Sequence, residues 1–139
     1  MRSTITFNDV LLVPKYSKIA SRKSIDLSVN FGNDISLGCP FVSSPMDTVT
    51  ESSMASAISS QGGLGIIHRY NTIEEQVNLV RETVELKASA VGAAVGVSGD
   101  YEERACALYD AGARVICIDV AHGHHAMMKE ALKNLKVAF

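Results

Sequence analysis

The chain has 139 residues and a mass of 14.9 kDa, the size of a single domain with a sizeable core, so we expect one domain over residues 1–139. Hydrophobic residues make up 47% and charged residues 20%, which excludes a largely disordered chain. With 13 basic and 15 acidic residues the formal net charge is −2, and without a basic cluster we expect no nucleic acid partner.

Residues 1–36 are predicted to form an extended N-terminal arm, and residues 37–139 to form four βα units in series. Short apolar runs recur about 25 residues apart, at positions 40–44, 64–68, 91–97 and 115–120. Continuous apolar runs, rather than strict alternation, are typical of parallel strands that helices cover. We therefore predict an α/β fold with four parallel strands.

The segments between these runs are predicted to be helices. Three of them begin with the N-cap to N3 spacing of a capping box: Thr48 with Glu51, Thr72 with Glu75, and Asp100 with Glu103. The second helix is predicted to bury one stripe: Ile73, Val77, Val80 and Val84. The third is predicted to end at Gly112, and the fourth to bury Met128, Leu132 and Leu135.

A glycine cluster at residues 62–65 superficially resembles a dinucleotide fingerprint. Such a fingerprint follows a strand and opens a helix, whereas these glycines follow a helix and open a strand. We interpret Gly62 and Gly63 as a helix C-cap and a tight loop, and we expect Gly65 to be small for packing.

Repeated βα units can close into a (β/α)8 barrel or lie open as a doubly wound sheet, and the placement of polar residues favours the barrel. In a barrel, the loops after the strands form the working face. Polar side chains gather at these positions: Ser43, Ser44 and Asp47, then His68 and Arg69, then Ser98, and finally Asp119, His122, His124 and His125. Such a face could hold an anionic ligand that carries a sugar.

Four segments together resemble the IMP dehydrogenase and GMP reductase family. They are TFNDVLLVPKYS at 6–17, SSPMDTVTE at 43–51, GGLGIIHR at 62–69 and IDVAHGH at 118–124. The resemblance implies a (β/α)8 TIM barrel, of which this chain would supply the arm and about four βα units, a half-barrel. It also implies oxidation of IMP to XMP with NAD, or reduction of GMP to IMP and ammonia with NADPH, in a homotetramer.

The resemblance also implies roles for individual residues. Met46 would pack on the purine base and Ser44 would bond the ribose or phosphate end of the nucleotide. Asp119 would accept hydrogen bonds from the ribose of the nicotinamide half, and Arg69 would lie near the adenosine side of the dinucleotide. His122 and Gly123 would shape the same cofactor loop.

Several motifs of the family have no counterpart in this sequence: the catalytic cysteine loop, the potassium loop, the phosphate-binding glycine loops and the mobile flap. We therefore assign no catalytic residue and expect the 139-residue chain to be a truncated form that is inactive alone. The tandem CBS module of most dehydrogenases is also absent, since residues 85–90 form a bare connection. Its absence favours GMP reductase or a compact dehydrogenase without the module, whereas residues 46–51 and 92–97 favour the dehydrogenase, which we prefer.

Other readings of these residues remain open. His122, His124 and His125 could share a metal ion, but no cysteine or carboxylate set stands at ligand spacing, so we predict no metal site. Asp119 could simply cap a helix, and the pair Met127–Met128 is expected to fill gaps in the core. The chain could also be a non-catalytic half-barrel that binds nucleotide or associates with itself through its open strand edges.

The cellular setting follows from two further features. The three cysteines, Cys39, Cys106 and Cys117, form no CxxC pair, and we expect them to stay reduced. The N-terminus lacks the apolar stretch of a signal peptide, and the run at 90–97 is too short to span a bilayer. We expect a cytoplasmic protein with no membrane partner.

Overall fold

The computed structural model describes residues 4–32 and 34–138; residues 1–3 and 33 of the predicted arm, and Phe139, lie outside it. The element order is η1(Arg22–Ser24), β1(Val29–Gly32), β2(Ile35–Leu37), β3(Val42–Ser43), α1(Ser52–Ser60), β4(Leu64–Ile67), α2(Ile73–Glu85), β5(Val91–Val95), α3(Tyr101–Ala111), β6(Val115–Ile118) and α4(Ala126–Ala138). The four predicted βα units are therefore present, with strands shorter than the apolar runs.

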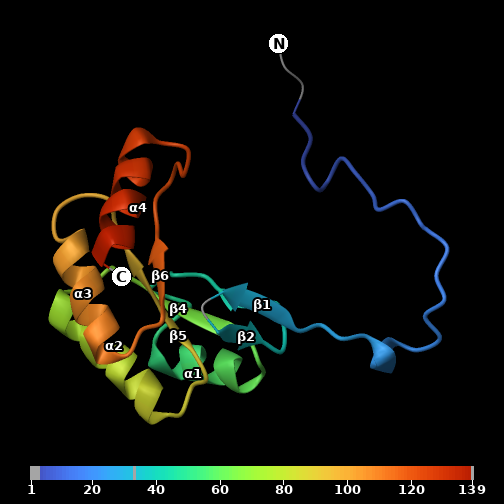
Figure 1. The fold of residues 1–139 in the computed structure, drawn as a ribbon, viewed down its shortest axis with the longest axis horizontal. Coiled ribbons are helices and arrows are strands. Elements are labelled where there is room, and N and C mark those ends of the chain that lie inside the picture. The colour runs from blue at the N-terminus through green and yellow to red at the C-terminus, as the bar shows by residue number, and fades with distance from the viewer. Residues whose placement is uncertain (1–3, 33, 139) are drawn as a thin grey trace.

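The main sheet is parallel throughout, in the order β3-β4-β5-β6. Neighbours in sequence are neighbours in space, as in a segment of a (β/α)8 barrel. Within the described residues the sheet is open rather than closed, so the fold is an α/β half-barrel. The helices pack along one side of this sheet (Figure 1).

Alternate side chains of the strands divide between two apolar clusters. One cluster packs strand residues against the helices and includes Ile67, Val95 and Leu108. The other lies on the opposite face, where Ile66 and Ala94 of the main sheet meet Leu37 of the β1–β2 hairpin. Both faces of the central strands are thus covered, which explains why their sequences are apolar at consecutive positions.

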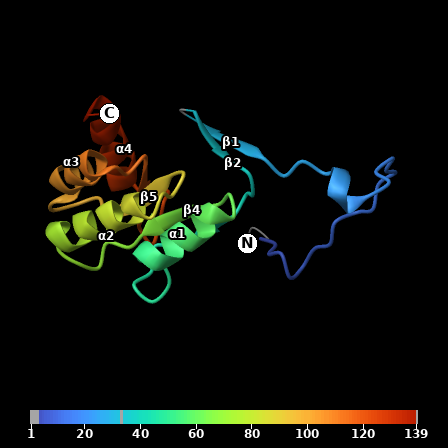
Figure 2. The ribbon, with the colours of Figure 1, turned by 90° about the horizontal axis from the view of Figure 1, so that it is seen from below.

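The N-terminal segment is only partly the extended arm that the sequence predicts. Strands β1 and β2 pair antiparallel, and Leu37 of β2 packs on the sheet face that lies opposite the helices. Before β1, the chain runs away from the sheet in both views (Figures 1 and 2), and large apolar side chains there are almost fully exposed, with Phe7 at 97% and Leu12 at 98%. The described residues contain no helix with the length and apolar character that a bilayer crossing needs.

Of the three predicted capping boxes, one is confirmed. The Thr72 hydroxyl accepts from the amide of Glu75, whose carboxylate accepts from the Thr72 amide. Helix α1 starts at Ser52 with Glu51 as its N-cap and no side-chain cap, so the Thr48 prediction is wrong. Asp100 is the N-cap residue of α3 but bonds Arg104 instead of a helix amide.

The predicted apolar stripes need two corrections. In α2, Val77 and Val80 are buried, but Val84 is 43% exposed, and the polar side chains of Gln76 and Thr83 are buried in its place. In α4, Leu135 is buried, whereas Leu132 and Met127 are exposed at 53% and 45%. The helix buries Ala131 instead of Leu132, which lines a surface cavity together with Met128.

The glycine interpretation is confirmed for the tight turn and for Gly65, although the C-cap of α1 is Gln61 and Gly62 follows it. Gly62 has a φ of 83°, and Gly112, which ends α3, has a φ of 116°, both in the left-handed region that favours glycine. A Cβ at Gly65 would overlap the Cα of Ala55 in α1. Helix α1 therefore approaches β4 closely because Gly65 has no side chain.

This close approach predicts that Gly65→Ala destabilises the fold. The added methyl must push α1 away from β4, and overpacking of this kind costs about 1–3 kcal/mol. Urea denaturation measures the loss. Gly38→Ala is the matched control, since a Cβ there would lie 3.8 Å from the Cα of Gly62, an ordinary contact. Equal stability of Gly65→Ala and the unaltered chain would contradict the packing described.

Candidate functional site

The loops after the parallel strands all lie at one edge of the sheet, which we call the rim. Because β3 to β6 are parallel, their carboxyl ends share that edge. Ser44 follows β3, Arg69 follows β4, Ser98 follows β5 and Asp119 follows β6. The rim thus gathers the polar residues that the sequence predicts there.

The loop after β3 carries Ser44 and Met46, and its shape is fixed by the fully buried side chain of Thr50. The Thr50 Oγ1 atom lies 2.6 Å from the carbonyl oxygen of Ser44 and 2.9 Å from the Oγ of Ser43. Two further amides, of Val49 and Thr50, donate to the carbonyl of Met46. The Ser44 and Met46 side chains themselves stay exposed, so they are free to contact a ligand.

His68 is a structural residue rather than an open rim group. It is 4% exposed, and its Nδ1 accepts the amide proton of Tyr70 at 3.1 Å. With Nδ1 as acceptor, the neutral ring carries its proton on Nε2, which faces the Oε1 of Glu51 at 3.3 Å. His68 thereby ties the loop after β4 to the start of α1.

The loops after β4 and β6 meet through an ion pair between Arg69 and Asp119. The Nε of Arg69 lies 3.5 Å from the Oδ2 of Asp119, and both side chains are about one-third exposed. The Arg69 Nε is buried yet has no hydrogen-bond partner among the described residues. A buried donor left unpaired is a place where a ligand atom can bind.

Arg69 lines a small polar cavity at the rim. The cavity has a volume of about 130 Å³, and its other lining residues are Gly96, Val97, Ser98, Asp100, Arg104 and Val120. A Cβ at Gly96 would come within 3.4 Å of the Arg69 Nη1, so this glycine leaves room for the guanidinium. Ligand pockets usually measure roughly 300–1,000 Å³, so this cavity suits one group of a larger ligand.

A larger cavity, of about 660 Å³, lies between the loop after β3 and α2, but its charge does not suit a nucleotide. Its lining includes four carboxylates and no lysine or arginine: Asp47, Glu51, Glu75 and Glu82. These carboxylates would repel an anionic ligand. The small cavity has two guanidinium groups and one carboxylate in its lining, so it has no excess of negative charge and is the better candidate.

The histidines after β6 do not join the Arg69 cavity. His122 is exposed, and Gly123 lines a separate cavity of about 400 Å³ with His124, His125 and Met128. His125 uses its Nδ1 to accept the amide proton of Met127. Over residues 4–32 and 34–138 we find no group of three histidine, cysteine or acidic residues placed to hold a metal ion.

The three cysteines do not resemble activated nucleophiles. Cys39 is half-buried in a loop and Cys106 is exposed on α3. Burial in β6 raises the pKa of the Cys117 thiol, and the negative charge of Asp119 raises it further, so the reactive thiolate is disfavoured. The structure gives no reason to assign any of them a catalytic role.

Sequence reasoning missed three buried polar residues that shape the rim: Thr50, Gln76 and Arg104. Gln76 and Arg104 are hydrogen-bonded to each other at 2.8 Å across two helices. One signal was available, since Gln76 stands beside Val77 and one turn before Val80, on the buried stripe of its helix. Nothing in the sequence pattern marks Thr50 or Arg104.

Together, the parallel strand order and the βα units define part of an α/β barrel domain of the (β/α)8 class. The chain matches the IMP dehydrogenase / GMP reductase domain over residues 4–139. It belongs to this family.

Several proteins that are similar to this chain are named inosine-5'-monophosphate dehydrogenase. The protein of Nitrosopumilus maritimus is 55% identical over 85 residues, which cover 61% of this chain and 17% of the relative. The proteins of Cryptosporidium parvum and Borreliella burgdorferi are 34% and 31% identical, over 95% and 99% of this chain and 43% and 46% of the relatives. The chain thus spans less than half the length of these relatives.

The contact between Asp100 and Arg104 predicts a pH dependence of stability. The hydrogen bond from Arg104, at 2.8 Å, holds the pKa of the Asp100 carboxyl below its ordinary value, and the positive charge of Arg69 acts in the same direction. A carboxyl with a lowered folded pKa stabilises the protein above its unfolded pKa. That contribution is lost as pH falls from the ordinary value of 3.8 through the lower folded pKa.

We therefore expect Asp100→Asn to lose less stability in acid than the unaltered chain. Urea denaturation at about pH 6 and about pH 3 gives the change in the free energy of unfolding with pH, which is the slope compared for each protein. Asp110→Asn, on the exposed last turn of the same helix, is the control and should keep the original slope. Identical slopes for Asp100→Asn and the unaltered chain would contradict the role of this pair.

Proposed function

We propose that this chain forms part of an oxidoreductase of the IMP dehydrogenase type, which oxidises IMP to XMP with NAD. The observation that carries this proposal is the ion pair between Arg69 and Asp119 at the rim, in which the Arg69 Nε makes no hydrogen bond to the described residues. The names of the relatives favour the dehydrogenase over a GMP reductase that uses NADPH. IMP and XMP would be its ligands, rather than a nucleic acid or a membrane.

The purine nucleotide would bind at the loop after β3. Met46 is half exposed, and its thioether would pack on the base, while the exposed Ser44 hydroxyl would bond the ribose or phosphate. Because Thr50 fixes the turn between them, these two side chains would need little reorganisation to bind.

The dinucleotide would bind across the loops after β4, β5 and β6. NAD, when bound, supplies the hydride acceptor. The ionised Asp119 would accept hydrogen bonds from its nicotinamide ribose, and the Arg69 guanidinium would stack on adenine or pair with phosphate. His122 and Gly123 would border the same ligand outside the Arg69 cavity.

The rim residues present fit part of this ligand. The Arg69 cavity, of about 130 Å³, has room for one polar group, and the Arg69 side chain lines it. We assign no nucleophile among the described cysteines, so we propose that the 139-residue chain does not turn over alone. We also propose that the potassium ion of the family binds outside these 139 residues. Free cysteines fit a reducing, cytoplasmic setting.

Replacement of Asp119 by alanine tests the cofactor assignment in the native protein. Hydrogen bonds to a charged group contribute about 1.5–3 kcal/mol, so Asp119→Ala should weaken NAD binding about tenfold or more. Affinity for IMP should change by less than about twofold. Isothermal titration calorimetry measures both dissociation constants.

The control is Asp110→Ala, which removes an exposed carboxylate from α3. It should leave both affinities unchanged. An unaltered NAD affinity in Asp119→Ala, or an equal loss of NAD and IMP affinity, would contradict the proposed role.

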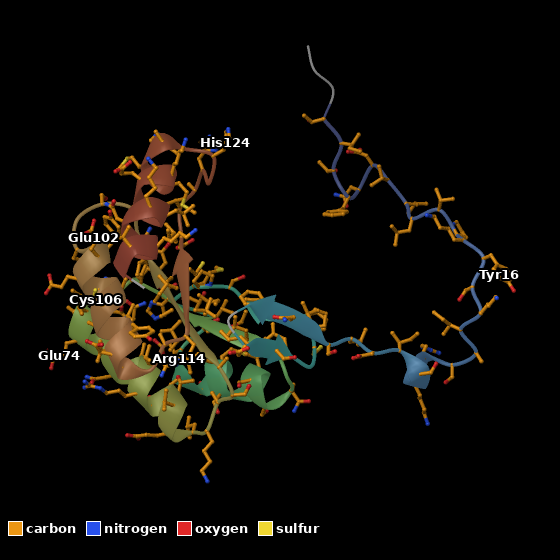
Figure 3. All side chains as sticks on the ribbon, viewed as in Figure 1. Tyr16, Glu74, Glu102, Cys106, Arg114 and His124 are labelled. Atoms are coloured by element: carbon orange, nitrogen blue, oxygen red, sulfur yellow. The ribbon has the colours of Figure 1, made fainter. Side chains whose placement is uncertain are left out.

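A second candidate function, self-association, is favoured by the exposed apolar arm. Phe7, Leu11 and Leu12 are each at least 95% exposed, and exposed apolar stretches of this kind mark interaction sites. We propose that the chain associates with further copies, up to the tetramer that is usual for the family. Tyr16 lies on the same arm, distant from the sheet (Figure 3).

Light scattering coupled to size exclusion tests this proposal. The unaltered chain should have a mass well above 14.9 kDa, and the double variant Leu11→Ser with Leu12→Ser should shift toward that monomer value. Leu86→Ser is the control, since Leu86 is 53% exposed but lies after α2 rather than on the arm. A folded, soluble sample of the unaltered chain at the monomer mass would exclude self-association.

A further inference from the structure

A buried polar network joins α2, α3 and the ends of the two central strands. The Gln76 side chain is fully buried; its Nε2 donates to the carbonyl of Ala94 at 2.9 Å and lies 3.5 Å from the carbonyl of Ile67. Its Oε1 accepts from the Nη1 of Arg104 at 2.8 Å. Gln76 therefore connects the carboxyl ends of β4 and β5 to the guanidinium of Arg104 on the neighbouring helix α3.

Arg104 in turn connects the loops after these strands. Its Nη2 donates to the carbonyl oxygen of Asn71 at 3.1 Å and to the Oδ2 of Asp100 at 2.8 Å. Asn71 belongs to the loop that carries Arg69, and Asp100 to the loop that carries Ser98. One guanidinium, only 8% exposed, thus spans both loops that border the small cavity.

Packing alone does not account for this arrangement. Burial of an unpaired charge is strongly unfavourable, and an apolar residue would fill the same space without that penalty. Here Arg104 has an acceptor from α2, from the loop after β4 and from the first residue before α3. These hydrogen bonds hold the loops after β4 and β5 at a fixed separation.

We propose that Arg104, oriented by Gln76, is a positioning residue for the dinucleotide: it fixes the loops after β4 and β5 so that Arg69 meets the ligand. This inference rests on the proposed function, because it assigns Arg69 to the cofactor. Arg104 acts through the backbone of Asn71 and the carboxylate of Asp100, not through its own contact with NAD.

The chemistry of the guanidinium group allows a graded series of variants at Arg104. Arginine presents its donors in a rigid plane, so Nη1 and Nη2 reach different partners together. Lysine carries a compact charge on a flexible stem and cannot reproduce that fork. Arg104→Lys should therefore keep the charge but release one loop, and Arg104→Met should release both.

The experiment compares these variants in the native protein with Arg114→Met. Arg114 lies at the start of β6, at the end of the sheet opposite His124 (Figure 3), and its guanidinium stacks over Tyr109 at 5.3 Å. The control thus removes a guanidinium of the same size far from the rim. Unfolding temperatures are recorded for every variant, and all other measurements are made well below them.

The first readout is amide hydrogen exchange without ligand, in residues 69–72 and 96–100. Arg104→Met should raise exchange in both segments about tenfold, and Arg104→Lys less, while the core of α2 stays protected. The second readout is binding: Arg104→Met should weaken NAD about tenfold and IMP less than about twofold. A general loss of stability would not separate the two ligands in this way.

The third readout is a double-mutant cycle on NAD affinity with Arg69→Met. If Arg104 acts by placing Arg69, the effect of Arg69→Met shrinks in the Arg104→Met background. Additive effects, unchanged exchange in both loops, or equal losses for NAD and IMP would each overturn this inference alone. Failure of the unaltered protein to bind NAD would overturn the proposed function, and this inference with it.

Discussion

The parallel pairing of β3, β4, β5 and β6 is the constraint on which the rest of the structure depends. It brings residues from four distant parts of the chain to one edge, and it requires a close approach of helix and strand. At Gly65 that approach leaves no room for a side chain, and at Gly92 in β5 a Cβ would overlap the side chain of Ile66 in the neighbouring strand β4. The glycines in these strands therefore serve packing and make no phosphate-binding turn.

Three of the four rim loops are held by a buried polar side chain. Thr50 holds the loop after β3, His68 and Arg104 hold the loop after β4, and Arg104 holds the loop after β5 through Asp100. Loops at a protein surface are usually its most mobile parts. These hydrogen bonds at the base of the loops make a preorganised frame for the exposed side chains to which we assign ligand binding in our proposal.

The sequence predicted the features that follow from local chemistry. Apolar runs located four strands, the Thr72 and Glu75 spacing located one helix start, and Gly112 located a helix end. It failed where contacts between elements override the local spacing. Asp100 has cap spacing but bonds Arg104, and Val84 fits the helical stripe while Thr83 is the buried residue. The hairpin β1–β2 was missed because its short strands carry a weak pattern and pack only against a distant sheet face.

A map of amide chemical-shift changes in the native protein would test whether the rim is a shared nucleotide site. IMP should perturb residues 43–47, and NAD should perturb Arg69, residues 96–100 and Asp119. Both sets lie at the carboxyl ends of the strands. Changes confined to the opposite edge, around Gly63, Ala90 and Arg114, would contradict the account.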